Sequence, residues 1–388
     1  MIVLFWMALA IVFYTFLGYG MVLYTLTRIK RLFVKSKVFM QPKQLPKVTL
    51  LVAAWNEEDL IVEKIKNTLL LDYPSALFQI IFITDGSTDR TLERILPYKE
   101  ITSLNNGDRN GKMAAIKRAM PYVEGEIIIF SDANTFLNRE AVKQLVKHYQ
   151  NEKVGAVAGE KRILVEKQAD ASSAGEGFYW KYESKLKTWD YELYSNVGAA
   201  GELFSIRASL YQPVESDTII DDHMIAMRIA EQGYIIAYEP NAYASETASA
   251  NTKEELKRKI RIAAGGIQSI LRLKKAANPF RNPLLTFQYI SHRVLRWTIT
   301  PFMLIVAFIL NIFIVAGNHP KIYTILLLGQ ILFYVCSYIG LLFEQKNIKI
   351  KSFFVPYYFC VMNYAVIAGL FRYINKNQSA AWERSKRK

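Results

Sequence analysis

Cysteine and histidine are scarce in this chain. Its 388 residues include two cysteines and four histidines. Cys336 and Cys360 both lie in apolar stretches, and the histidines do not occur at metal-ligand spacing. This pattern gives no disulfide framework and no Cys-x-x-Cys zinc site. Internal repeats and low-complexity tracts are absent as well. We therefore exclude a disulfide-stapled scaffold, a zinc-ribbon protein and a repeat protein.

Charge is missing from four long stretches of the sequence. Met1 to Leu26 carries no charged residue, and neither do Thr298 to Gly317, Ile322 to Phe343 and Phe353 to Phe371. About 20 apolar residues suffice to cross a bilayer as a helix. The first stretch lacks the basic start of a secretory signal peptide. We interpret it as an uncleaved anchor, and we prefer membrane spans to buried helices for the other three.

The positive charge is concentrated beside these stretches. The net charge is +15, and two basic groups flank the first and second apolar stretches. They are Arg28, Lys30, Arg31, Lys35 and Lys37 in the first group, and Lys257, Arg258, Lys259, Arg261, Arg272, Lys274 and Lys275 in the second. Basic residues beside spans mark the cytoplasmic face and bind anionic lipid. We therefore expect membrane lipids as partners, no nucleic acid, and a cytosolic soluble block.

The C-terminus conflicts with this topology. If all three C-terminal stretches cross, the basic tail Arg384 to Lys388 lies outside, against the positive-inside rule. Phe353 to Phe371 is the weakest candidate span because it contains Pro356 and Asn363. Either this stretch is re-entrant or interfacial, or the rule fails here.

Between the apolar stretches, strand and helix patterns alternate. We expect strands over 48–54, 78–84 and 126–131. Helices are expected from residue 56 onward and over 89–96, 111–120, 139–149 and 175–194. Such alternation predicts an α/β fold with a mostly parallel sheet, in which ligands bind outside the carboxyl ends of the strands.

Acidic side chains stand where these strands end. Asp85 ends one strand, Asp132 and Asn134 end another, and Asp221 with Asp222 forms a third acidic group. The last pair has a structural alternative, since Asp favours the start of a helix. Carboxylates at strand ends suggest a metal and phosphate site for a nucleotide-activated substrate.

A small-residue turn contains Gly198 and Gly201 and runs into another expected strand. Small residues there would let a sugar approach the backbone. A plain tight turn is the alternative.

These motifs together resemble the family 2 glycosyltransferases of GT-A (Rossmann-like) fold. The resemblance covers about Val48 to Leu273. Within the family, it is to the membrane-embedded branch that contains the hyaluronan, cellulose and poly-N-acetylglucosamine synthases. The matching segments are Trp55-Asn56-Glu57, Asp85-Gly86-Ser87, Arg109-Asn110-Gly111-Lys112, Asp132-Ala133-Asn134 and Ile220-Asp221-Asp222. No single segment is specific, but their order and spacing are.

The resemblance implies a role for each matching residue. Asp222 would be the catalytic base. Independently of the resemblance, like-charge proximity of Asp221 would raise the pKa of Asp222, and the small-residue turn would place Gly198 and Gly201 at the acceptor. The nucleotide sugar would be bound by Glu57, Asp85, Lys112, Asp132 and Arg261. A divalent cation, Mg²⁺ or Mn²⁺, would be held by Asp132 and Asn134.

Two departures from the family pattern matter. Asn134 replaces the second acid of Asp-x-Asp, which keeps an oxygen ligand but removes a charge. The processive synthases carry Gln-x-x-Arg-Trp on the helix at the membrane, whereas this chain has Arg258-Lys259-Ile260-Arg261-Ile262, in which only Arg261 matches. The family's Trp contacts the acceptor sugar, so its absence here weakens the expectation of processive extension.

We predict an inverting glycosyltransferase of the cytoplasmic (inner) membrane with several spans. It would move a sugar from a nucleotide sugar, expected to be a UDP-sugar, to a polysaccharide or glycolipid. Its other partners would be a glycan or lipid-linked acceptor and accessory polysaccharide-export proteins. One alternative is a transferase that loads a single sugar onto polyprenyl phosphate. Another is a non-catalytic membrane scaffold on a transferase fold.

The expected organisation has five parts. Residues 1–27 form an anchor and 28–47 a basic linker. Residues 48–250 form the cytosolic transferase domain and 251–297 amphipathic helices at the bilayer surface. Residues 298–388 form the C-terminal membrane segments and basic tail.

Overall fold

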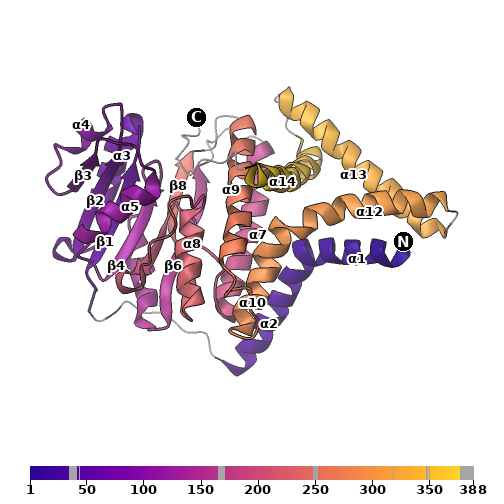
Figure 1. Ribbon diagram of the computed structural model, residues 1–388, viewed down its shortest axis with the longest axis horizontal. Helices are drawn as coiled ribbons and strands as arrows, with labels where there is room; N and C mark the ends of the chain where they lie inside the picture. The colour runs from indigo at the N-terminus through magenta and orange to yellow at the C-terminus, as the bar shows by residue number, and fades with distance from the viewer. Residues whose placement is uncertain are drawn as a thin grey trace.

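The computed structural model describes residues 1–34, 42, 44–164, 171–247, 252–317, 319–346, 348 and 350–375, with the backbone alone for 164, 171–179, 247 and 252. Lys35, Lys37 and the basic tail of the sequence predictions lie outside these residues, as does the expected boundary at 250. Within the described part, one sheet with covering helices forms one side of the molecule. Apolar helices extend from its other side (Figure 1).

The sheet has eight strands in the order β3-β2-β1-β4-β7-β6-β8-β5. Their bounds are β1 Val48–Ala54, β2 Phe78–Asp85, β3 Thr102–Asn106, β4 Ile127–Asp132, β5 Phe136–Leu137, β6 Val154–Leu164, β7 Phe204–Arg207 and β8 Ile235–Thr247. The pairs β1–β2, β1–β4, β2–β3 and β6–β8 are parallel, and those of β4–β7, β6–β7 and β5–β8 are antiparallel. The predicted α/β class with a mostly parallel sheet is confirmed.

Helices cover both faces of this sheet. They are α3 Glu58–Leu69, α4 Thr91–Ile95, α5 Lys112–Ala119, α6 Ala141–Val146, α7 Ala171–Leu193, α8 Asp221–Glu231 and α9 Thr252–Arg272. Successive strand residues point to opposite faces. Leu50 and Val52 of β1 therefore pack in one core cluster with α3 and α6, while Leu51 packs in a second cluster with α5 and α8. A strand buried on both faces is largely apolar, which explains the nearly continuous apolar run of β1, where the buried Thr49 is the one polar residue.

The sequence patterns located the strands of one half of the sheet better than those of the other. The long interior strands β6 and β8 were not predicted, and neither were the edge strands β3 and β5. β1, β2 and β4 lie where their apolar runs predicted them, within one residue at each end. β3 has the sequence Thr-Ser-Leu-Asn-Asn and was not predicted. It lies at the end of the sheet and pairs on one side only. An edge strand needs little apolar surface, so its sequence lacks the apolar run by which a buried strand is predicted.

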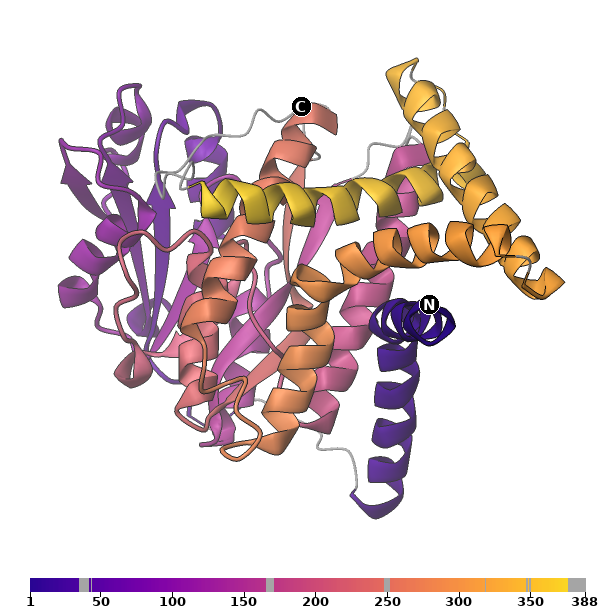
Figure 2. The same ribbon diagram turned by 45° about the vertical axis from the view of Figure 1, so that its right-hand side comes forward.

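The N-terminal apolar stretch forms a bent helix. α1 spans Ile2–Phe13, a π-helical turn follows at Tyr14–Gly18, and α2 spans Tyr19–Phe33. Figure 2 shows α1 and α2 running in different directions on either side of this turn, at a kind of site where helices bend. Leu23 of α2 packs with Leu186 of α7. The first helix is therefore anchored to the sheet domain through its second half.

Ionic contacts hold the end of α2 on α7. The ammonium group of Lys30 donates hydrogen bonds to the carbonyl oxygens of Glu192 at 2.7 Å and Leu193 at 2.8 Å. Arg31 forms an ion pair with the Glu192 carboxylate, in which Nη2 lies 2.7 Å from Oε2. Two of the basic residues that the sequence assigned to the lipid surface therefore cap a helix of the soluble domain.

The C-terminal part is helical. It contains α10 Pro283–Tyr289, a π-helical segment Ile290–Val294, α11 Leu295–Trp297, α12 Ile299–Ala316, α13 Lys321–Gln345 and α14 Lys351–Ile374. Among the described residues, four helices are long and apolar enough to cross a membrane: Ile2–Phe33, α12, α13 and α14. Figure 1 shows α1, α12 and α13 extending away from the sheet domain, whereas α14 turns back toward α9.

A buried polar cluster joins this part to α7. His292 Nδ1 lies 2.5 Å from Asp190 Oδ2, and its Nε2 lies 3.0 Å from Glu183 Oε1. Arg296 donates to Glu183 over 2.8 Å, and the Tyr19 hydroxyl donates to Asp190. Burial alone would raise the pKa of Glu183, but His292 and two arginines outweigh it and lower that pKa well below its ordinary value. The cluster ties α2, α7 and the segment before α12 into one unit.

Candidate active site

A cavity of about 490 Å³ opens where β1 and β4 end and is closed on its other side by α7, α8, α9 and α14. Nine of the ten predicted site residues line it: Glu57, Lys112, Asp132, Asn134, Gly198, Gly201, Asp221, Asp222 and Arg261. Segments more than 100 residues apart in sequence thus meet at one place. Asp85 is the predicted site residue that does not line this cavity.

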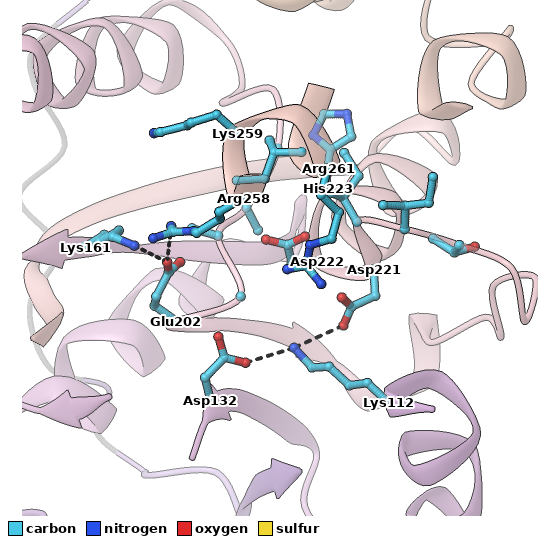
Figure 3. Close-up of a pocket in the computed structure, with 18 of the residues that line it drawn as sticks. Lys112, Asp132, Lys161, Glu202, Asp221, Asp222, His223, Arg258, Lys259 and Arg261 are labelled. Carbon is cyan, nitrogen blue, oxygen red and sulfur yellow. Dashed lines mark hydrogen bonds and ion pairs between the residues drawn. The ribbon is translucent and has the colours of Figure 1, made fainter. Parts of the chain in front are cut away.

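Lys112 is the centre of the charged part of the cavity. Its ammonium nitrogen donates to Asp132 Oδ1 at 2.9 Å and lies 3.3 Å from Asp221 Oδ2, as Figure 3 shows. Burial alone would lower the pKa of Lys112, but the carboxylates of Asp132, Asp221 and Asp222 outweigh it and raise that pKa. Lys112 is therefore a permanent positive charge, placed at the start of α5.

Asp222 has the opposite electrostatic situation. Burial first and the neighbouring Asp221 second raise the pKa of its carboxyl group, and with Lys112 opposing them the pKa is about 7. The sequence attributed the shift to Asp221, but desolvation is the larger cause. A carboxylate with a pKa near neutrality can accept a proton from a hydroxyl group.

Gly201 lies among these groups. A Cβ atom at this position would be 3.5 Å from Lys112 Nζ and 3.6 Å from both Asp132 Oδ2 and Asp222 Oδ2. Any longer side chain would therefore enter the space between the two carboxylates. Gly198 has a φ of +135° and faces His223, whose Nδ1 would lie 2.5 Å from a Cβ atom. Because these two residues have no side chain, the backbone of this turn can lie close to the carboxylates and to His223.

Asp85 organises the loop that carries Lys112. Its Oδ2 accepts hydrogen bonds from the N–H groups of Asn110 at 3.1 Å and Gly111 at 2.6 Å. Its Oδ1 accepts from Arg118 at 3.0 Å. Of these partners, Gly111 lines the cavity and Asn110 and Arg118 do not, so Asp85 reaches the site through the loop and not by its own side chain. The predicted direct contact of Asp85 with the nucleotide stays a prediction.

Lys64 was missed by the sequence reasoning and is wholly buried. Its ammonium group donates to Ser131 Oγ and to the carbonyl oxygen of Thr135, both at 2.7 Å. It thereby holds the ends of the loop that presents Asp132 and Asn134. The sequence signal for a buried lysine was its position on the apolar face of the expected helix, between Ile61 and Ile65.

A second charged group was also missed. Glu202 accepts from Lys161 at 2.5 Å and from Arg258 at 3.4 Å (Figure 3). Burial alone would raise the pKa of Glu202, but these two cations outweigh it and lower it. The position of Glu202 next to Gly201 is the sequence signal that was available.

Trp297 supplies an aromatic group that the sequence had not located. It lines the cavity and packs on α9, where a Cβ atom at Gly266 would come within 2.6 Å of the indole ring. The ring lies edge-on to His223, with the centroids 5.3 Å apart. Ile262 stands where the processive family has its Trp, and the indole reaches the cavity from α11 instead.

The oxygen ligands in the cavity suit a hard divalent cation. Within the described ranges, no three His, Cys, Asp or Glu side chains gather as a complete metal site. Asp132 and Asn134 nevertheless line one cavity, and the nearby Asp221 Oδ2 is buried without a hydrogen bond. Magnesium-type sites commonly use one or two carboxylates and complete their shell with substrate phosphates. The residues fit such an ion when a diphosphate is present.

An α/β sheet with an acidic pocket at its strand ends, joined to apolar helices, defines a membrane-associated enzyme of GT-A fold. Residues 49–212 match the model of the family "Glycosyl transferase family 2". The chain therefore carries a family 2 glycosyltransferase domain, as the motifs predicted.

Curated relatives agree with this assignment. The chain is 33% identical over 168 residues to a beta-monoglucosyldiacylglycerol synthase of Nostoc sp., which covers 41% of this chain and 34% of that protein. It is 26% identical over 263 residues to a poly-beta-1,6-N-acetyl-D-glucosamine synthase of Staphylococcus aureus, covering 65% and 62%. The matches thus span about a third of the first relative and under two thirds of the second.

A solved structure has the same fold. A mannosyltransferase from Pyrobaculum calidifontis, in complex with GDP-Man and Mn²⁺, superimposes with a TM-score of 0.72 at 22% identity. The match covers 97% of this chain and all of that one. It therefore includes the apolar helices as well as the sheet domain.

Proposed function

We propose that this protein is an inverting glycosyltransferase that moves a sugar from a nucleotide sugar to an acceptor hydroxyl at the cytoplasmic membrane. One observation carries the proposal. Asp222, with its pKa near 7, lies in the same cavity as the Asp132–Lys112–Asp221 ion-pair chain. Asp222 is suited to take a proton from the acceptor. Lys112, together with a cation held by Asp132, is suited to bind a diphosphate.

Lys112 would stabilise the leaving group. Negative charge builds on the nucleotide diphosphate as its bond to the sugar breaks, and a fixed cation in a desolvated site favours that charge. Asp132 and Asn134 would hold a divalent cation there, which acts as a Lewis acid on the diphosphate when bound. The Mn²⁺ and GDP-Man in the structural neighbour support both parts of this proposal.

Asp222 would be the base. The acceptor oxygen attacks the anomeric carbon of the sugar and loses its proton to the Asp222 carboxylate. The bond between that carbon and the diphosphate oxygen breaks, and its electron pair leaves with the nucleotide diphosphate. Attack from the face opposite the leaving group inverts the anomeric centre and gives a β-linkage from an α-linked donor.

The membrane setting is supported by the four apolar helices and by the basic residues beside them. The two relatives have names that refer to a glycolipid and a polysaccharide, so glycan and lipid-linked acceptors both belong to the proposal. For the donor we retain a UDP-sugar as the first expectation. The GDP-Man of the neighbour makes GDP-sugars the second.

Nucleotide release by the purified protein tests the proposal. The donors are UDP-, GDP- and TDP-sugars, each with Mg²⁺ or Mn²⁺ and membrane extract as acceptor, beside Asp222→Asn. We expect cation-dependent release from one donor class, reduced about 10²–10⁴-fold in the variant. If the folded protein releases nucleotide from none of the donors, the transferase proposal is wrong and the non-catalytic scaffold becomes the preferred function. An α-linked product would contradict inversion.

A further inference from the structure

α14 is long and apolar enough to cross a membrane, yet it packs on the soluble domain. A Cβ atom at Gly369 would lie 2.7 Å from Ala263 Cβ, 2.9 Å from the Ala264 nitrogen and 3.0 Å from the Ile260 carbonyl oxygen. The backbones of α14 and α9 therefore touch. Figure 2 shows α14 lying across α9 and α7.

The middle of α14 forms part of the cavity wall. Met362, Ala365 and Val366 line the same cavity as Asp222, and with Gly369 they follow the i, i+3, i+4, i+7 spacing of one helix face. Across from them, Ile262 and Ala263 of α9 continue the apolar lining. The centre of this helix is thus at the level of the catalytic carboxylates.

The outward side of α14 is apolar as well. Tyr364, Phe371 and Ile374 are 57%, 58% and 60% exposed. Because the inner side packs on α9 and the outer side is apolar, the outer side of α14 suits contact with lipid, both for a helix along the bilayer and for one that crosses it.

Charge at the two ends of α14 agrees with a surface position. Lys346, Lys349 and Lys351 lie just before or at its start, and Arg372 lies in its last turn. The sequence between α12 and α13 has no lysine or arginine, and the nearest one is Lys321, the first residue of α13. If α12 and α13 cross and α14 does not, the lysines before α14 and the basic C-terminal tail fall on the catalytic side. The positive-inside rule is then satisfied.

We propose that α14 does not cross the membrane but lies at its surface, where its inner face forms the acceptor wall of the cavity and receives the hydrocarbon part of a lipid acceptor. This inference rests on the proposed function for the identity of the reaction. A hydroxyl-bearing lipid is the acceptor class that fits, because a carboxylate base is needed for a hydroxyl and not for a phosphate. The lipid would enter beside α14 with its hydroxyl toward Asp222.

Cysteine labelling tests the position of α14 without reference to activity. In a Cys336→Ser, Cys360→Ser background, Lys321→Cys, Lys351→Cys and Asn375→Cys are treated with an impermeant maleimide in oriented membrane vesicles. We expect Lys351→Cys and Asn375→Cys to react from the same side and Lys321→Cys from the other. Reaction of Asn375→Cys together with Lys321→Cys makes α14 a membrane span and overturns the proposal.

Tryptophan substitutions test the acceptor wall. Ala365→Trp fills the inner face, and Tyr364→Trp changes the neighbouring residue on the outer face. Donor binding is measured by equilibrium dialysis, and transfer is measured into phosphatidylcholine vesicles that contain diacylglycerol. We expect Ala365→Trp to bind donor normally but to lose at least about tenfold in transfer, as overfilling an apolar site does, while Tyr364→Trp resembles the wild type.

The outcomes separate the two proposals. If Ala365→Trp transfers sugar at the normal rate, the inner face of α14 does not receive the acceptor, and that part of the proposal is wrong. Donor turnover supported by water-soluble glycans and not by the lipid vesicles overturns the lipid acceptor. Failure of the wild type to bind any nucleotide sugar overturns the proposed function, and the labelling result still decides where α14 lies.

Discussion

The two walls of the cavity differ in chemistry and in origin. The donor wall comes from the ends of β1 and β4 and the start of α5, and it carries Lys112 and Asp132. The membrane wall comes from α9, α11 and α14. Its α14 part is apolar around Ala365, whereas α9 adds Arg258, Lys259 and Arg261 beside the apolar Ile262 and Ala263. Charged chemistry at strand ends leaves short motifs that can be found in the sequence. An apolar wall is assembled from residues that resemble any other hydrophobic segment.

Charges in the cavity depend on one another, including the pairing of Glu202 with Arg258 of α9, whereas the apolar contacts of α14 are more nearly independent. Lys112 balances three carboxylates, and Glu202 is balanced by Lys161 and Arg258. Removal of one partner leaves a buried charge uncompensated, which is costly. We therefore expect the largest mutational effects on the donor wall and smaller, graded ones on the membrane wall.

Replacement of Lys112 should have the largest effect. Lys112→Met removes the fixed cation and should lower nucleotide release about 10²–10³-fold. Lys117→Met, on the exposed side of the same helix, should leave release unchanged. Release and thermal unfolding are measured for both. If Lys112→Met keeps more than a tenth of the wild-type rate, Lys112 does not stabilise the leaving diphosphate.

Gly201 tests the border between the two walls. Its Cβ position lies at van der Waals distance from Lys112, Asp132 and Asp222. Gly201→Ala should therefore fold and stay active, whereas Gly201→Val should lose about 10²-fold, because groups in the site are displaced by about 1 Å. Gly107→Val is the matched control, since no atom lies within 4 Å of that Cβ position. Equal rates for both valine variants would contradict this prediction.

The pH dependence should report Asp222. Its carboxyl pKa is raised to about 7, so the basic form is lost as the pH falls through that value. We expect kcat/KM to decrease about tenfold per pH unit below pH 7 and to level off above it. The residual activity of Asp222→Asn should lack this limb. A wild-type profile that is flat from pH 5 to 8 would exclude Asp222 as the base.

The seam between α14 and α9 should give the smallest effect on rate. Gly369→Leu overpacks a contact between two backbones and should cost about 1–3 kcal/mol of stability, with only a severalfold loss of transfer. Gly329→Leu in α13 is the control, because nothing lies within 4 Å of its Cβ position. Detergent-stability curves and acceptor KM values are compared. A loss of donor affinity in Gly369→Leu would show that the walls are coupled.

Sequence patterns predicted parts of the fold unequally. β1, β2 and β4 were found because strands buried on both faces are continuous apolar runs. The edge strand β3 was not found, since Thr102–Asn106 has only one apolar residue. Lys64 escaped notice because a single lysine on an apolar helix face resembles a solvated charge. Only its contacts with Ser131 and Thr135 reveal that it is buried.

What the sequence by itself determined is the local chemistry: the first alternating strands and helices, the acidic and basic motifs at strand ends, and four stretches apolar enough for a membrane. Those properties depend on periodicity and on residues close together in the chain. Tertiary structure alone decided that Lys112 lies between Asp132 and Asp221, that Asp85 supports the Lys112 loop without lining the cavity, and that α14 returns to line the cavity. These relations join residues about 20 to 230 positions apart. Contacts over such separations depend on how the faces pack, and a hydrophobic pattern does not specify its partner.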